Sequence, residues 1–250
     1  MSSGQRPAGV GAASSQESPP PEVAVEVATP TGPARVHVRR PDRPRGLAVL
    51  GHGAGGGLRS VDLTAAVLAL VAQGWTTALV EQPWLVAGRR IAGPPRTLDA
   101  AWVPVVHALR APGAVLDGVL NGVLDGVPGP LLLAGRSAGA RVACRTATLL
   151  HADAVLALSF PLHPPGRPER SRAFELALVL EAGLPIAVVQ GEKDPFGGPA
   201  EVAAHLPAGC VHVVKATHTV PASSARAVGE AVAAFAGSVL GAAAHPGMAP

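Results

Sequence analysis

The sequence predicts an α/β fold, in which a mostly parallel sheet of about eight strands is covered by helices on both faces. Two observations lead to this prediction. Short runs rich in Val, Leu and Ile alternate with longer segments of helical pattern, as in parallel sheets that are buried on both sides. Several of these apolar runs end in glycine-rich or polar stretches, at the strand ends where such sheets place their functional residues.

The expected elements follow one another along the chain, and most are bounded by Gly, Pro or a capping residue. The first two strands form a hairpin around residues 30–33. Ser60 caps the first helix, which stops at Gly74, and Thr97 caps the second. Segment 112–129 is assigned to neither class. The expected strands are 23–28, 34–38, 46–50, 76–80, 131–134, 154–159, 186–190 and 211–215, and the expected helices are 60–73, 97–110, 138–150, 171–182, 199–205 and a last one from about 222.

The chain is expected to be one domain, residues 22–240, between two tails. Residues 1–21 are rich in Ser, Gly, Pro and Gln and are expected to be disordered, and residues 241–250 are expected to be flexible. No charged-then-apolar leader opens the chain, and the longest apolar run, 63–72, is too short to span a bilayer. These features predict no membrane partner and a cytoplasmic location.

The charge of the chain argues against a nucleic-acid partner. The net charge is only +3, and the arginine cluster near the N-terminus lacks the aromatic residues or basic helix of a nucleic-acid surface. We expect the cluster to lie on the solvated surface of the hairpin. Its members are Arg35, Arg39, Arg40, Arg43 and Arg45.

No metal or cofactor is expected. The two cysteines, Cys144 and Cys210, are too few and too far apart for a disulfide framework or a zinc site, and Cys144 is expected to be a buried thiol. The glycine-rich stretch 51–57 lacks the G-K-[ST] sequence and the G-x-G-x-x-G spacing of nucleotide-binding loops.

A G-x-S-x-G pattern follows the apolar run 131–134. Gly135, Ser137 and Gly139 stand where a buried strand would turn sharply into a helix. Such a turn strains the backbone of the serine, and a β-carbon two residues to either side would collide with the strand or the helix. We expect this turn to present the Ser137 hydroxyl as a nucleophile; the alternative is that Ser137 only caps the helix.

Two further polar residues follow later strands. Asp194 comes after strand 186–190 and His218 after the last strand, so the order along the chain is Ser–Asp–His. A serine hydroxyl needs an imidazole to take its proton, and the imidazole needs a carboxylate on its other nitrogen. We therefore expect Ser137, Asp194 and His218 to form a catalytic triad.

Alternatives remain open for the acid and the base. Asp194 precedes a proline and could serve only as a turn residue, in which case Glu192 could act as the acid. His218 is one of nine histidines, although only His218 lies just past the last strand; the alternative for it is a surface role.

The glycine-rich stretch after strand 46–50 is expected to help stabilise the oxyanion. Negative charge that develops on a carbonyl oxygen needs two N–H donors already held in place. We expect one donor to be the amide of Ala138, which follows the nucleophile. The other should be the amide of Ala54, with Gly55 as the runner-up.

Together, the His-Gly stretch, the serine turn, the Gly-x-x-Asp and the late histidine resemble the α/β-hydrolase superfamily, near its dienelactone-hydrolase-like members. One branch of it contains bacterial hydrolases and the eukaryotic testis-expressed and NSL-complex-subunit hydrolase-like proteins. The segments that look like this branch are 158–168 and 191–197, and those similar to its bacterial members are 82–84, 88–90 and 98–102. The resemblance covers about residues 23–240 and implies the same triad.

The expected function is hydrolysis of a small acyl ester through an acyl-enzyme. The alternatives are a non-catalytic interaction module that keeps the fold, or an acyltransferase or perhydrolase on the same triad. Segments 82–96 and 160–172 should roof an open cleft without a large lid domain, suited to a small-molecule substrate. The side chains that could form its rim are His52, Arg89, Arg90, Arg136, His163 and Arg167.

Overall fold

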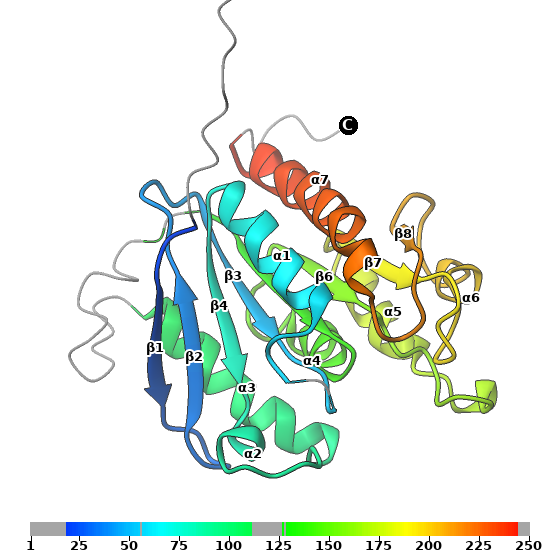
Figure 1. Ribbon diagram of the computed structural model, residues 1–250, viewed down its shortest axis with the longest axis horizontal. Coiled ribbons are helices and arrows are strands. Elements are labelled where there is room, and N and C mark those ends of the chain that lie inside the picture. The colour runs from blue at the N-terminus through cyan, green and yellow to red at the C-terminus, as the bar shows by residue number, and fades with distance from the viewer. Residues whose placement is uncertain (1–18, 56, 112–126, 128, 245–250) are drawn as a thin grey trace, which may run out of the picture.

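The computed structural model describes residues 19–55, 57–111, 127 and 129–244 (Figure 1). Most of the two predicted tails and most of the unassigned segment 112–129 lie outside these residues. At the C-terminal boundary, the last helix continues to Ala244, four residues beyond the predicted end of the domain at Leu240.

One sheet forms the centre of the described molecule. Its strands are β1 (Glu22–Val27), β2 (Ala34–Arg39), β3 (Gly46–Gly51), β4 (Trp75–Glu81), β5 (Leu131–Arg136), β6 (Ala154–Leu158), β7 (Ile186–Gly191) and β8 (Val211–Val214). They lie in the order β1-β2-β4-β3-β5-β6-β7-β8. The pairs β1–β2 and β2–β4 are antiparallel, and every other pair is parallel. The predicted sheet, mostly parallel with about eight strands, is confirmed.

Helices cover both faces of this sheet, as predicted. They are α1 (Val61–Ala72), α2 (Pro83–Val86), α3 (Pro95–Arg110), α4 (Ala138–Thr146), α5 (Ala173–Glu181), α6 (Pro199–Ala203) and α7 (Ala225–Ala244), with short 3-10 turns at Pro168–Arg170 and Ala222–Ser224. Helices α1 and α7 pack together on one face, in front in Figure 1. Helices α3, α4 and α5 pack on the other face. The two hydrophobic layers are therefore separated by strands that are buried on both sides.

Two predicted helix caps differ from the structure. Helix α3 begins at Pro95 after Pro94, not after a Thr97 cap, because proline suits the first helical position, where a backbone N–H has no partner in any case. Ser60 does occupy the N-cap position of α1, but its side chain makes no capping hydrogen bond.

The hairpin β1–β2 carries part of the arginine cluster on its surface. Arg35 contacts Glu26 at 3.3 Å and Glu81 at 3.5 Å, and Arg39 contacts Glu22 at 3.1 Å. Such half-exposed ion pairs contribute little to stability. They agree with the prediction that these arginines lie on a solvated hairpin.

One helical stretch in the described residues, Ala222–Ala244, is long and apolar enough to cross a membrane by length and composition alone, with a mean hydropathy of 1.6. The apolar-run criterion applied to the sequence did not single it out. Val228, Val232 and Ala236 are buried in the layer that this stretch shares with α1. A helix that covers the core of a sheet passes the same test, so this feature is weak evidence for a membrane.

Candidate active site

The carboxyl ends of β5, β7 and β8 bring three predicted residues together. Ser137 follows β5, Asp194 follows β7 and His218 follows β8. Ser137 Oγ lies 2.9 Å from His218 Nε2, and His218 Nδ1 lies 2.8 Å from Asp194 Oδ2. A carboxylate only accepts hydrogen bonds, so Nδ1 carries the proton and Nε2 is free to accept the proton of the serine. The three side chains form one hydrogen-bonded chain.

The turn between β5 and α4 holds Ser137 in a strained conformation. Its φ is +52° and its ψ is −110°, a region that residues with a side chain rarely adopt. A β-carbon on Gly135 would lie 2.4 Å from the carbonyl carbon of Gly139, and one on Gly139 would lie 2.3 Å from the Gly51 oxygen. The glycines at both ends of the pattern are therefore required by close backbone contacts, as the sequence predicted.

Asp194 is held by a set of buried hydrogen bonds. Its side chain is fully buried, Oδ1 accepts from the Phe196 amide at 2.9 Å, and Oδ2 accepts from Gln190 Nε2 at 3.2 Å as well as from His218. Glu192, the alternative acid, is exposed. Of the two carboxylates that the sequence offered, only Asp194 reaches the histidine.

Gln190 is a functional residue that sequence reasoning missed. Besides contacting Asp194, its amide donates to the carbonyl oxygens of Phe160 and Gly197 and accepts from the Phe160 amide. It therefore joins the loop after β6 to the loop that carries the acid. The available signal was a polar residue at the end of an otherwise apolar strand, where a buried amide has to find partners.

Arg136 is buried and supports the loops around the triad, so its predicted place on the substrate rim is wrong. The residue is only 8% exposed. Its Nε donates to Asp62 Oδ2 at 3.1 Å, and its Nη2 donates to the carbonyl oxygen of His218 at 2.7 Å. The guanidinium thus ties the serine turn to α1 and to the loop of the histidine, and Asp62 neutralises its charge.

The two expected oxyanion donors lie near each other beside the serine. Ala138 is the first residue of α4, where helix amides have no intrahelical partner, and it lines a small cavity together with Ala54. Neither amide donates a hydrogen bond to another residue of the described chain. The runner-up, Gly55, is exposed in the same turn, and Gly56 lies outside the described residues. Both Ala amides are therefore available to a ligand.

His52 lines this cavity and is buried, so it is not part of an exposed rim. It is 3% exposed, and its Nε2 accepts a hydrogen bond from the Gln82 amide at 3.1 Å, which leaves the proton on Nδ1 for the Gly53 oxygen. Burial lowers the pKa of His52 below its ordinary value. A neutral His52 therefore holds the start of the segment after β4, where its ring also contacts Trp84.

The other predicted rim residues fall into two groups. His163 is buried, and its Nε2 lies 3.0 Å from Glu201. Its hydrogen bond to the Pro164 oxygen and, to a smaller extent, its interaction with Glu201 raise the pKa of His163. Arg89, Arg90 and Arg167 are exposed. Of the predicted rim residues, these three arginines are the exposed ones.

A family model described as the alpha/beta hydrolase domain matches residues 44–219, a span that includes the serine turn, the acid and the histidine. The chain belongs to the α/β-hydrolase superfamily. The resemblance found in the sequence is thereby confirmed at the level of the superfamily and the fold. No curated protein sequence matches the chain.

Solved structures of several α/β hydrolases are similar to this one. An α/β serine hydrolase without lid from Xanthomonas campestris is 20% identical, with a TM-score of 0.60, over 86% of this chain and 91% of its own. A serine hydrolase homologue from Coxiella burnetii is 17% identical, with a TM-score of 0.65, over 85% and 96%. Dienelactone hydrolase from Anabaena variabilis is 17% identical, with a TM-score of 0.62, over 87% and 97%. These likenesses concern the fold.

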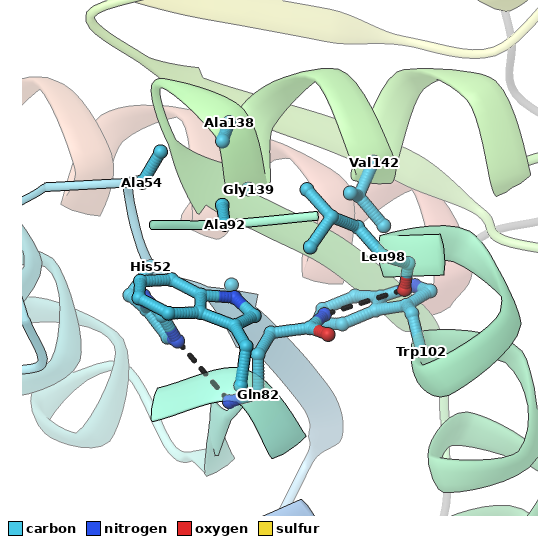
Figure 2. A pocket seen from close by; sticks show the side chains of 11 residues that line it. His52, Ala54, Gln82, Ala92, Leu98, Trp102, Ala138, Gly139 and Val142 are labelled. Carbon is cyan, nitrogen blue, oxygen red and sulfur yellow. Dashed lines mark hydrogen bonds between the residues drawn. The ribbon is translucent and has the colours of Figure 1, made fainter. Parts of the chain in front are cut away.

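Two cavities of this α/β hydrolase lie around the segment after β4, which contains only the short helix α2 and no lid domain. The small cavity, with room for about one water molecule (about 10 Å³), is lined in part by Ala54, Ala138 and Gly139 (Figure 2). The larger one, of about 460 Å³, is lined by Arg89 and by the hairpin turn at Gly32. The two cavities share Gln82, Trp84 and Leu98.

Replacing Gly139 by Ala should destabilise the hydrolase by about 1–3 kcal/mol, because the added β-carbon would overlap the Gly51 oxygen and push α4 away from β3. Urea unfolding measures this change. Gly241→Ala is the matched control, since nothing lies within 4 Å of a β-carbon there, and alanine favours a helix. Equal stability of the Gly139 and Gly241 variants would contradict the close contact.

Proposed function

We propose that this chain is a serine hydrolase that cleaves small acyl esters through an acyl-enzyme. The observation that supports this proposal is the hydrogen-bonded chain from Ser137 Oγ to His218 at 2.9 Å and from His218 to the buried Asp194 at 2.8 Å. A strained serine, a base on its hydroxyl and a carboxylate on the far side of that base are the parts that nucleophilic acyl transfer requires.

In the first half of the reaction, Ser137 Oγ attacks the ester carbonyl carbon while its proton moves to His218 Nε2. The resulting oxyanion is stabilised by the amides of Ala138 and Ala54. When the C–O bond to the leaving group breaks, the imidazolium returns the proton to the departing alkoxide, and an alcohol leaves. The serine then carries the acyl group.

In the second half, water takes the place of the serine hydroxyl as the nucleophile. His218 takes one proton from the water as its oxygen attacks the acyl carbon, and then gives that proton to Ser137 Oγ as the acyl bond breaks. The acid product leaves, and the serine is restored. Throughout, Asp194 holds the imidazole in the productive tautomer and stabilises its positive form.

A fluorophosphonate probe tests this proposal directly, since it reacts with a serine only when a base activates the hydroxyl. We expect the intact protein to be labelled and the modified peptide to contain Ser137. Labelling should disappear in Ser137→Ala. It should persist in Ser159→Ala, a matched control because Ser159 also has a positive φ (+48°) and follows the neighbouring strand β6.

Failure of the intact, folded protein to react with the probe would contradict the proposal and favour a non-catalytic interaction module. A labelled protein that releases free acid in water, with no added alcohol or peroxide, acts as a hydrolase. One that forms product only when such an acceptor is present acts as an acyltransferase or perhydrolase on the same triad.

A further inference from the structure

The small cavity next to Ala54 and Ala138 is lined by two residues that carry unsatisfied polar atoms. In the described part of the molecule, five buried side-chain atoms have no hydrogen-bond partner, and two of them, Gln82 Oε1 and Trp102 Nε1, belong to residues that line this cavity. Gln82 is 5% exposed and Trp102 is fully buried. An acceptor and a donor without partners are costly in such a place, so each requires a physical explanation.

The local structure keeps Gln82 in this orientation. Its side-chain Nε2 donates to the Leu98 oxygen at 3.4 Å, and its backbone amide donates to His52 at 3.1 Å (Figure 2). Rotating the amide by half a turn would place Oε1 against the Leu98 carbonyl oxygen, and two acceptors would then face each other. Flipping the side-chain amide of Gln82 therefore does not give its oxygen a hydrogen-bond donor.

The position of the cavity identifies which part of a substrate would enter it. Ala54 and Ala138, whose amides we assign to the oxyanion, lie on its wall, as does Val142, one helical turn further along α4. A carbonyl group held by those amides would place one substituent of its carbon against the cavity, and we assign that place to the acyl side. Leu98 and Trp102, one turn apart on α3, close the opposite wall (Figure 2).

The cavity is small and its free atoms are of opposite kinds. A volume for about one water molecule (about 10 Å³) admits one further heavy atom but no extended alkyl chain. The group that fits must accept from an indole N–H and donate to an amide oxygen. A hydroxyl group does both with a single heavy atom, whereas a carboxylate cannot donate and a methyl group can do neither.

We propose that this cavity receives the hydroxyl of a short 2-hydroxyacyl group, so that the hydrolase prefers esters of small 2-hydroxy acids. The hydroxyl accepts from Trp102 Nε1 and donates to Gln82 Oε1. This inference rests on the proposed function. The reaction remains the hydrolysis described above, in which the ester and one water give the 2-hydroxy acid and an alcohol.

The test compares three methyl esters, the glycolate, the methoxyacetate and the propionate, by titrating the acid released. The glycolate and the methoxyacetate carry an electron-withdrawing oxygen at the same carbon, but only the glycolate can donate a hydrogen bond. Each kcat/KM is divided by the rate constant of the same ester with hydroxide, which removes intrinsic reactivity. We expect the corrected value for glycolate to exceed those for both other esters by roughly tenfold or more.

Variants identify the groups responsible. Trp102→Phe removes the indole N–H, and Gln82→Met removes the amide oxygen, so each should lower the glycolate-to-propionate ratio by roughly tenfold. Trp75→Phe is the matched control, because Trp75 Nε1 is also buried without a partner but lies outside the cavity. It should leave the ratio within about twofold of that of the parent protein.

Each outcome decides at least one of the two proposals. A protein that reacts with the fluorophosphonate but shows equal corrected values for the three esters overturns the 2-hydroxyacyl inference and leaves the serine hydrolase standing. So does a ratio that is unchanged in Trp102→Phe and Gln82→Met, which would mean that the two atoms bind only a structural water. A protein that does not react with the probe overturns both proposals.

Discussion

Asp194→Asn should lower kcat for ester hydrolysis by about 10⁴-fold while the protein remains folded. The buried carboxylate now accepts from His218 Nδ1 at 2.8 Å, which leaves Nε2 free to take the serine proton. An asparagine NH2 group in that place would donate to Nδ1. The imidazole proton would then move to Nε2, where it blocks the acceptance of a proton from Ser137.

Steady-state kinetics on a soluble aryl ester measures this effect, and circular dichroism checks the fold. Glu192→Gln is the matched control, because it removes a carboxylate two residues earlier that is exposed. Its kcat should stay within about twofold of that of the parent protein, as expected for a surface change outside the site. A similar loss in both variants would mean that the acid has been assigned wrongly.

Glu175→Ala should lower the free energy of unfolding by about 3–5 kcal/mol, the largest stability effect that we expect. The Glu175 side chain on α5 is fully buried and accepts from Arg141 at 2.7 and 2.8 Å and from Arg145 at 2.8 Å, both on α4. Its removal leaves two cations in the interior with less compensation, although Arg145 keeps Asp99 on α3.

Thermal unfolding should show a drop in Tm of roughly 10 °C for a chain of this size. Glu230→Ala is the matched control, because Glu230 forms an exposed ion pair with Arg226 at 3.0 Å on α7. It should change stability by less than about 1 kcal/mol. Equal shifts for the two variants would contradict a structural role for the buried network. Burial, and after it the charge of Glu175, raises the pKa of the Cys144 thiol.

Features that depend on neighbours in the chain could be predicted from the sequence. A strand that is buried on both faces appears in the sequence as an apolar run. The alternation of such runs with helical segments predicted the strands and most helices to within a few residues. Gly135 and Gly139 were predictable because a sharp turn excludes a β-carbon from those positions. Asp194 and His218 could be selected because parallel strands end at one edge of the sheet.

Helix starts were less predictable, because several residue types satisfy the same backbone requirement. Thr97 has the side chain of a good cap, yet the structure begins α3 at Pro95. A threonine cap and a proline in the first turn both accommodate amides that lack an intrahelical partner. The difference in energy between these two helix starts is small compared with the energy gained by packing the helix. Local preference therefore did not decide the boundary.

The sequence by itself determined the fold class, the order of the strands and helices along the chain and the three polar residues at the strand ends, because each depends on local pattern and on a general rule of parallel sheets. Only the tertiary structure decided what surrounds those residues. It directed Arg136 inward to Asp62, 74 positions away, and brought Gln190 into contact with Asp194. It also left two atoms, Gln82 Oε1 and Trp102 Nε1, without partners in residues that line a cavity next to Ala138. The physical reason is that the role of a buried polar group depends on its hydrogen-bond partners, and those partners come from distant parts of the chain.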